Sequence, residues 1–227
     1  MHMANVFVPS TGPDAWKAFL ADPEKQWASG YSARSLAHCW ESAHGFPPEV
    51  GKLLEQVPDL AGISPLLVFP EWKVPLPGGG RASQNDAWVL ASAPVGLVSM
   101  TIEGKVEEPF DRPLTEWKRD ASPGKQRRLE YLLSCLALDS EPKGTIYYQL
   151  LHRTASAVIE AERFHAKAAV MIVHSFSPTN RWFDEYREFA ALFGIDAEIG
   201  ALAGAKARDG LPLYLGWAHG DERYLSS

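Results

Sequence analysis

The sequence predicts an α/β fold in which helices flank a mixed β-sheet. Three runs between residues 64 and 108, separated by turn-forming residues, are typical of β-strands, and the third of them alternates apolar and polar side chains. A Val- and Ile-rich run, 167–177, follows the long amphipathic pattern of 147–165, as expected for a helix that returns the chain into a covered central strand. We expect one domain over residues 1–227, because a chain of 227 residues is long enough for one full core.

The first half of the chain predicts two helices followed by a three-strand meander. The first helix begins at Ser32, whose hydroxyl suits an N-cap, and ends near Gly45. The second begins at Pro48, a residue favoured in the first turn of a helix. Turn-forming residues then separate three predicted strands, which span residues 64–76, 86–93 and 96–108.

The second half of the chain predicts helices and strands in alternation. A long irregular connection leads into an amphipathic helix whose leucines face inward. The predicted elements are helices over 125–138 and 147–165, a strand over 167–177, a helix over 181–194 and a strand over 211–219. The order helix, three strands, two helices, strand, helix and strand therefore predicts the α/β class with a mixed sheet.

The third predicted strand has one apolar and one polar face. Its apolar residues (Val98, Met100, Ile102 and Val106) alternate with polar ones (Ser99, Thr101, Glu103, Lys105 and Glu107). In one interpretation the polar face is solvated, and Glu103 and Lys105 form a surface ion pair worth at most ~1 kcal/mol. In the other interpretation this face is a catalytic surface. Asp86 is likewise either part of that surface or a turn residue at a strand start.

Strand geometry places these charged groups where they can act together. Residues two apart on a strand face the same way, about 6.6–6.8 Å apart along the chain, so Glu103 and Lys105 share a surface. A paired neighbouring strand can bring Asp86 next to Glu103. Because two close carboxylates repel unless a cation lies between them, this pair favours a hard divalent ion with oxygen ligands, Mg²⁺ or Mn²⁺.

The arrangement resembles a known nuclease superfamily. Asp86 precedes Glu103-Gly104-Lys105 by 17 residues, and a long helix and an apolar strand follow. This resembles the PD-(D/E)XK, or restriction-endonuclease-like, superfamily, whose core is a helix, a three-strand meander, a helix and a fourth strand. The resemblance covers about residues 32–177, and 181–219 would add a C-terminal helix and strand. Asn85 stands where many members have proline.

The resemblance implies metal-dependent hydrolysis of phosphodiester bonds. Asp86 and Glu103 would hold Mg²⁺ or Mn²⁺, the backbone carbonyl of Gly104 would approach the metal, and Lys105 would orient or deprotonate the attacking water. A non-catalytic binding or interaction protein on the same fold is the alternative. A small-molecule hydrolase that uses Glu103 and Glu107 as acid and base is a further one.

Two other positions fit the resemblance. Gln149 and Arg153 are four residues apart on the predicted helix 147–165 and therefore share one face. The corresponding helix of the superfamily often places Gln, Lys or Arg near the metal to bind a phosphate, and the alternative here is an exposed helix face. Glu41, on the first long helix, is either an additional acidic residue of the site or a solvent-facing glutamate.

Charge and composition limit the partners. A net charge of −6 argues against non-specific coating of nucleic acid, but it leaves room for a local nucleic-acid site. The only notable basic concentration comprises Lys118, Arg119, Lys125, Arg127 and Arg128, which would either follow a nucleic-acid backbone or form a solvated helix face.

The sequence also predicts a cytoplasmic protein that is not inserted in a membrane. No apolar run reaches the ~18 residues of a membrane span. The first ten residues lack the pattern of a secretory signal. Cys39 and Cys135 are far apart in helical patterns, which indicates reduced, buried thiols.

Overall fold

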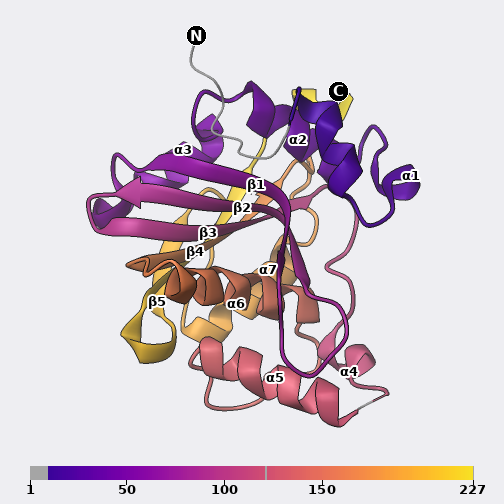
Figure 1. Cartoon of the computed structure of the whole chain (residues 1–227), viewed down its shortest axis with the longest axis vertical. Coiled ribbons are helices and arrows are strands. Elements are labelled where there is room, and N and C mark those ends of the chain that lie inside the picture. Colours follow the sequence, from indigo (N-terminus) through magenta and orange to yellow (C-terminus); the bar gives the residue numbers. More distant parts are fainter. Residues whose placement is uncertain (1–9, 121, 227) are drawn as a thin grey trace.

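Six strands form one mixed β-sheet in the computed structural model, which describes residues 10–120 and 122–226 (Figure 1). The order across the sheet is β1-β2-β3-β4-β6-β5. The strands are β1 (Ser64–Val74), β2 (Ser83–Ala93), β3 (Gly96–Lys105), β4 (Ala168–Ser175), β5 (Leu202–Lys206) and β6 (Pro212–His219). The predicted α/β class with a mixed sheet is therefore confirmed.

The sheet combines an antiparallel meander with parallel strands. β1 pairs with β2, and β2 pairs with β3, both antiparallel, as the sequence predicts. β4 lies parallel to β3, and β6 lies parallel to β4. The edge strand β5 pairs antiparallel with β6 and is absent from the sequence prediction. Its five residues are rich in alanine and glycine, which carry little strand signal.

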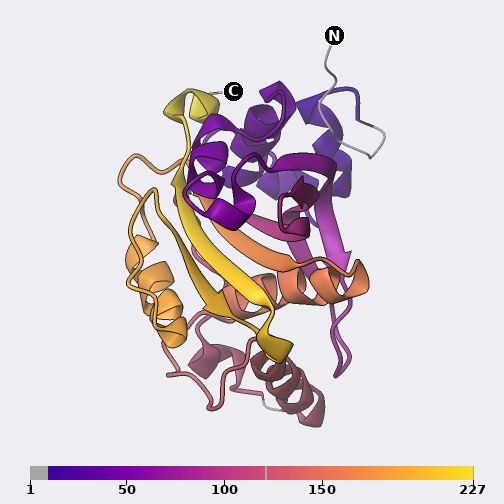
Figure 2. The ribbon, with the colours of Figure 1, turned by 90° about the vertical axis from the view of Figure 1, so that its left-hand side faces the viewer.

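Helices cover both faces of the sheet (Figures 1 and 2). The helices are α1 (Pro23–Gln26), α2 (Ser32–Ser42), α3 (Pro48–Leu54), α4 (Leu114–Trp117), α5 (Pro123–Cys135), α6 (Tyr148–Arg163) and α7 (Phe183–Ala190). Short 3₁₀ turns span Pro13–Phe19, Pro58–Leu60, Ala191–Phe193, Arg208–Gly210 and Glu222–Ser226. α2 and α3 pack on one face, whereas α5, α6 and α7 lie on the other. Each long helix matches a predicted one to within a few residues.

Two apolar clusters make up the core, one on each face of the sheet. Trp40 and Leu53 belong to the cluster under α2 and α3, and Leu151 and Trp217 belong to the cluster under α6 and α7. All eight residues of β4 are buried, which confirms the predicted strand covered on both faces. Cys39 and Cys135 are buried free thiols, also as predicted.

The polar face of β3 is buried, which differs from one of its two sequence interpretations. Ser99, Thr101, Glu103 and Lys105 are at most 3% exposed, because α6 covers them. The Thr101 hydroxyl donates to the backbone carbonyl of Arg153 in α6 at 3.0 Å. The solvated interpretation of this face is therefore wrong for β3. It holds only for Glu107, which lies beyond the strand and is exposed.

The length and polarity of each helix show whether that helix could cross a membrane. Within residues 10–120 and 122–226, no helix has the length and apolar character needed to cross a bilayer. The sequence predicts that the N-terminus lacks a secretory signal. That prediction rests mostly on residues 1–9, which lie outside the described residues.

The bond between Thr101 and α6 yields a test of how firmly α6 is held on β3. We expect Thr101→Val to lower the free energy of unfolding by about 1–2 kcal/mol, because it removes a buried hydrogen bond while preserving side-chain volume. Thr115→Val is the matched control, since the Thr115 hydroxyl also donates to a backbone carbonyl, that of Gly144, but at an exposed position. Equal losses in the two variants, measured by urea unfolding, would contradict a special role for the buried bond.

Candidate active site

β2 and β3 separate at the position of the predicted acidic residues. Their pairing ends at Ala87 and Ile102, whereas β2 continues to pair with β1 as far as Ser83. Asp86 therefore lies inside β2, beside a fork between the strands, and is not a turn residue at a strand start. Its Oδ2 accepts a hydrogen bond from the backbone N–H of Gly104 at 2.8 Å. Because the N–H and C=O of a strand residue leave from the same edge, the Gly104 carbonyl also faces this fork.

Glu103 is held by two cations on the buried face of β3. Lys105 Nζ lies 2.7 Å from Glu103 Oε1, and Arg153 Nε lies 2.5 Å from Glu103 Oε2. Arg153 Nη2 is also 3.8 Å from Asp86 Oδ1, so one guanidinium faces both carboxylates. The structure thus brings together four of the residues selected from the sequence.

The predicted pair on α6 is not on an exposed helix face. Arg153 is only 7% exposed, and Gln149 lines the same cleft one helical turn away. Gln149 Oε1 is buried and has no hydrogen-bond partner among the residues that the structure describes. An unsatisfied buried acceptor costs free energy, so Gln149 has bonding capacity for a ligand or a water in the cleft.

Glu71 is a third carboxylate of the site that the sequence analysis did not select. It lies in β1 between residues paired with Ala87 and Asn85, and hence across from Asp86. Its φ is +52°, a strained value for a non-glycine residue inside a strand. Gln84 Nε2 donates to Glu71 Oε2 at 2.7 Å. The only sequence signal was a charged residue, Glu71, within a predicted strand that is mostly apolar.

Burial and mutual repulsion set the charges of these groups. Burial, together with the negative charge of Glu103, raises the pKa of Asp86 to about 7. Burial and the charge of Asp86 raise the pKa of Glu71 to about 8. Burial opposes ionisation of Glu103 as well, but the charges of Arg153 and Lys105 outweigh it and lower the pKa of Glu103.

The donor atoms at the fork suit a hard divalent cation. Three carboxylates, from Glu71, Asp86 and Glu103, share the site with the cations of Lys105 and Arg153, which leaves one negative charge when all five groups are ionised. Carboxylate and carbonyl oxygens are the ligands that Mg²⁺ and Mn²⁺ prefer. A cation would also relieve the repulsion that raises the two pKa values.

These residues lie in a cleft of about 1180 Å³. One wall is the loop between β1 and β2, which reaches toward α5 in Figure 1. Arg128 of α5 fixes this loop by donating to the backbone carbonyls of Pro77, Gly79 and Arg81. Gly78 and Gly124 approach so closely that a Cβ on either would overlap the backbone of the other. The loop is therefore tightly bound to α5.

His152 contributes another wall of the cleft, and the sequence analysis did not select it. Its Nδ1 lies 2.7 Å from the Ser83 hydroxyl, and its ring packs against Tyr148. Burial and the charges of Arg153 and Arg128 lower the pKa of His152 well below its usual range. His152 is therefore neutral at pH 7.

The other acidic candidates have structural contacts elsewhere. Glu107 lies 3.5 Å from Arg181 at the surface, so it does not pair with Glu103 as an acid and base. Glu41 accepts hydrogen bonds from Trp16 Nε1 and the Ser10 hydroxyl, at 2.8 and 2.5 Å. Neither residue lines the cleft.

The predicted basic concentration is mostly engaged in the fold. Lys118 pairs with Glu141, the Lys125 ammonium donates to the Trp117 carbonyl, and Arg128 binds the β1–β2 loop. Lys73 and Arg81, which were not selected, line the cleft instead. Lys73 lies in the β1 strand that pairs with β2, and Arg81 lies in the loop that joins them, neither of which a local charge count reveals.

A second polar cluster on the opposite face of the sheet does not suit a metal. Ligand atoms of Cys39, Glu49 and His174 lie within 4.8 Å of one another. However, Trp40 Nε1 donates to His174 Nδ1 at 3.3 Å, and an indole can only donate. The ring proton must therefore be on His174 Nε2, which donates to Glu49 at 2.8 Å and is not available as a ligand.

The chain belongs to the family described as a domain of unknown function, DUF6946, whose model matches residues 9–222. Comparisons with curated proteins and with solved structures give no significant match.

The raised pKa of Asp86 predicts a pH-dependent stability of the metal-free protein. The unfolded carboxyl ionises near pH 3.9, so its contribution to stability is complete below that pH and is lost as the pH rises through about 7. In EDTA, we expect the free energy of unfolding to fall between pH 5 and pH 8, and to fall less in Asp86→Asn. The difference should be roughly 1–3 kcal/mol, since the loss extends over about two pH units, from pH 5 to the folded pKa of about 7, at about 1.4 kcal/mol per unit.

The matched control for this experiment is Asp196→Asn, at an exposed position. This variant should follow the wild-type pH profile in urea unfolding. Parallel profiles for the wild type and Asp86→Asn would show that Asp86 ionises normally in the folded protein.

Proposed function

We propose that the protein is a metal-dependent hydrolase of phosphodiester bonds. One observation carries the proposal: Asp86, Glu103 and the Gly104 backbone meet at the fork between β2 and β3, with Lys105 and Arg153 beside them. The order of helix, meander, helix and parallel strand supports the resemblance to the PD-(D/E)XK superfamily. A metal site at a strand fork would explain why charged groups are gathered on a buried sheet face.

Asp86, Glu103 and the Gly104 carbonyl would hold Mg²⁺ or Mn²⁺, with Glu71 as a further carboxylate nearby. When bound, such an ion polarises a phosphoryl oxygen and lowers the pKa of a coordinated water. Gly104 suits its position because a Cβ there would lie 3.3 Å from Ser32 Cβ and 3.4 Å from Asp86 Oδ2, closer than most side chains pack.

Lys105 and Arg153 would position the substrate and balance its charge. Lys105 Nζ has three protons and donates one to Glu103, so it retains donors for the attacking water or a phosphate oxygen. Arg153 Nη2 is 3.8 Å from Asp86, too far for a hydrogen bond, and can donate to a phosphate oxygen. Both cations lie on the cleft side of β3, where the charge of a phosphoryl transition state would develop.

Hydrolysis of bis(p-nitrophenyl) phosphate and of labelled oligonucleotides in Mg²⁺ or Mn²⁺ tests the activity. We expect EDTA to abolish cleavage, and Lys105→Ala and Asp86→Asn to lower kcat by about 100-fold or more, because each removes a group at the reacting centre. Glu107→Gln, outside the cleft, should keep the wild-type rate. Equal rates for the wild type and Lys105→Ala would reject the role given to Lys105.

Metal binding is tested separately by thermal unfolding. A saturating excess of Mn²⁺, near 100 times its Kd, should stabilise the wild type by about 2.7 kcal/mol and raise its Tm. Asp86→Asn should lose most of this increase, whereas Asp196→Asn should retain it. The same rise in Asp86→Asn would place the ion elsewhere.

The second candidate is a non-catalytic binding protein on the same fold. One observation favours it: both oxygens of Glu103 are already bound, by Lys105 and Arg153, so the pair is neutralised without a metal. This candidate predicts neither cleavage nor stabilisation by Mn²⁺ in a protein that unfolds cooperatively. Stabilisation by Mn²⁺ that depends on Asp86 would argue against it.

A further inference from the structure

We propose that the cleft takes a single strand of nucleic acid and excludes a duplex. This inference rests on the proposed phosphodiester hydrolysis, and it names the substrate class of the same site. Three features of the described residues carry it: the depth of the reacting groups, the side chains at the rim and the rigidity of one wall.

The reacting groups lie at the bottom of the cleft. Glu103 and Lys105 are almost completely buried, although both line the cleft. The cleft volume of about 1180 Å³ lies above the 300–1,000 Å³ that is usual for small-molecule sites, so the cleft has room for an extended ligand. A duplex has a persistence length of about 150 base pairs, so bending it to bring one phosphate into such a recess costs deformation energy, whereas a single strand is flexible enough to enter.

The rim offers the two kinds of contact that single strands use. Lys73 and Arg81 are exposed at the β1–β2 hairpin, and neither has a carboxylate within 4.0 Å among the residues of 10–120 and 122–226. Tyr31, which precedes α2, is 48% exposed and lines the same cleft. Free cations bind backbone phosphates, and an exposed aromatic ring stacks on a base of any sequence.

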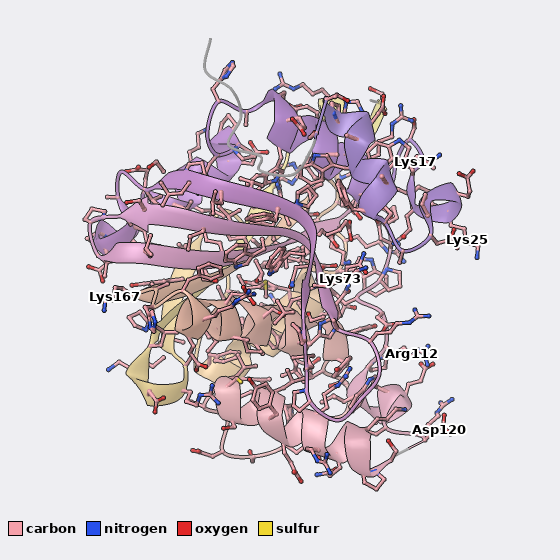
Figure 3. The ribbon with its side chains drawn as sticks, viewed as in Figure 1. Lys17, Lys25, Lys73, Arg112, Asp120 and Lys167 are labelled. Carbon is pink, nitrogen blue, oxygen red and sulfur yellow. The ribbon has the colours of Figure 1, made fainter. Side chains whose placement is uncertain are left out.

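The rigid wall keeps one of these cations in place. Arg128 donates to the carbonyl of Arg81 and to two further carbonyls of the same loop, so the backbone that bears Arg81 is fixed before any ligand binds. Lys25, also at the rim, is less available because it pairs with Asp22 at 3.0 Å. In Figure 3, Lys167 lies at the left-hand edge of the molecule, away from Lys73 near the middle and Lys25 at the right-hand edge.

Binding of labelled 12-nucleotide probes, measured by fluorescence anisotropy in EDTA and in Ca²⁺, tests the inference. Single-stranded DNA or RNA should bind at least 10-fold more tightly than a duplex of the same sequence. The double variant Lys73→Glu and Arg81→Glu should weaken single-strand binding at least 10-fold and flatten its salt dependence. Lys167→Glu, which makes half that charge change at the opposite end, should change binding less than 2-fold.

Substitutions of Tyr31 test the contribution of base stacking separately from that of the cations at the rim. Tyr31→Ala should weaken single-strand binding about 10-fold, and Tyr31→Phe should restore it, because phenylalanine keeps the ring. Equal or tighter binding of the duplex, or unchanged binding in the double variant, would overturn the inference.

Failure of this inference is distinguishable from failure of the proposed function. If bis(p-nitrophenyl) phosphate is hydrolysed but single strands bind no better than a duplex, the single-strand inference is wrong and the hydrolase stands. If single strands bind as expected but no diester is hydrolysed in Mg²⁺ or Mn²⁺, the binding site stands and the hydrolase is rejected.

Discussion

The ion pair between Arg153 and Glu103 is the interaction on which the rest of the site depends. A strand face with a glutamate and a lysine would normally remain in water, because burying an unpaired charge costs several kcal/mol. α6 can cover this face of β3 only because Arg153 supplies the second partner of Glu103 and the Thr101 hydroxyl bonds to α6. The packing of α6 on β3 therefore also brings the charged residues of the site together.

The fork between β2 and β3 explains how a regular sheet can expose reactive groups. Where the two strands separate, the sheet no longer satisfies the N–H of Gly104, and the Asp86 carboxylate takes that place. Glu71, whose strained backbone lies across from Asp86 in β1, adds a third carboxylate beside this fork. Such strain persists only where the surrounding structure holds it, and it is concentrated at functional sites.

The order of the elements could be predicted because each carries a local signal. Turn residues around β1 and β2, the alternation in β3 and the apolar run of β4 were enough to predict these strands, and amphipathic patterns predicted the long helices. β5 was missed because its alanines and glycines have no strand preference. The role of Glu71 was missed because two residues that lie across from each other in paired strands have no fixed separation in the sequence.

By itself, the sequence determined the α/β class and the meander, because period and residue type are local properties. The selection of Asp86, Glu103, Lys105 and Arg153 also needed the resemblance to the PD-(D/E)XK superfamily. Tertiary structure alone decided that the polar face of β3 is buried, since exposure depends on where α6 packs. It also decided which cations face the cleft: Lys73 does so from the paired strand β1 and Arg81 from the β1–β2 loop, whereas Arg128 holds that loop. Charge acts through distance in space, and only the fold sets that distance.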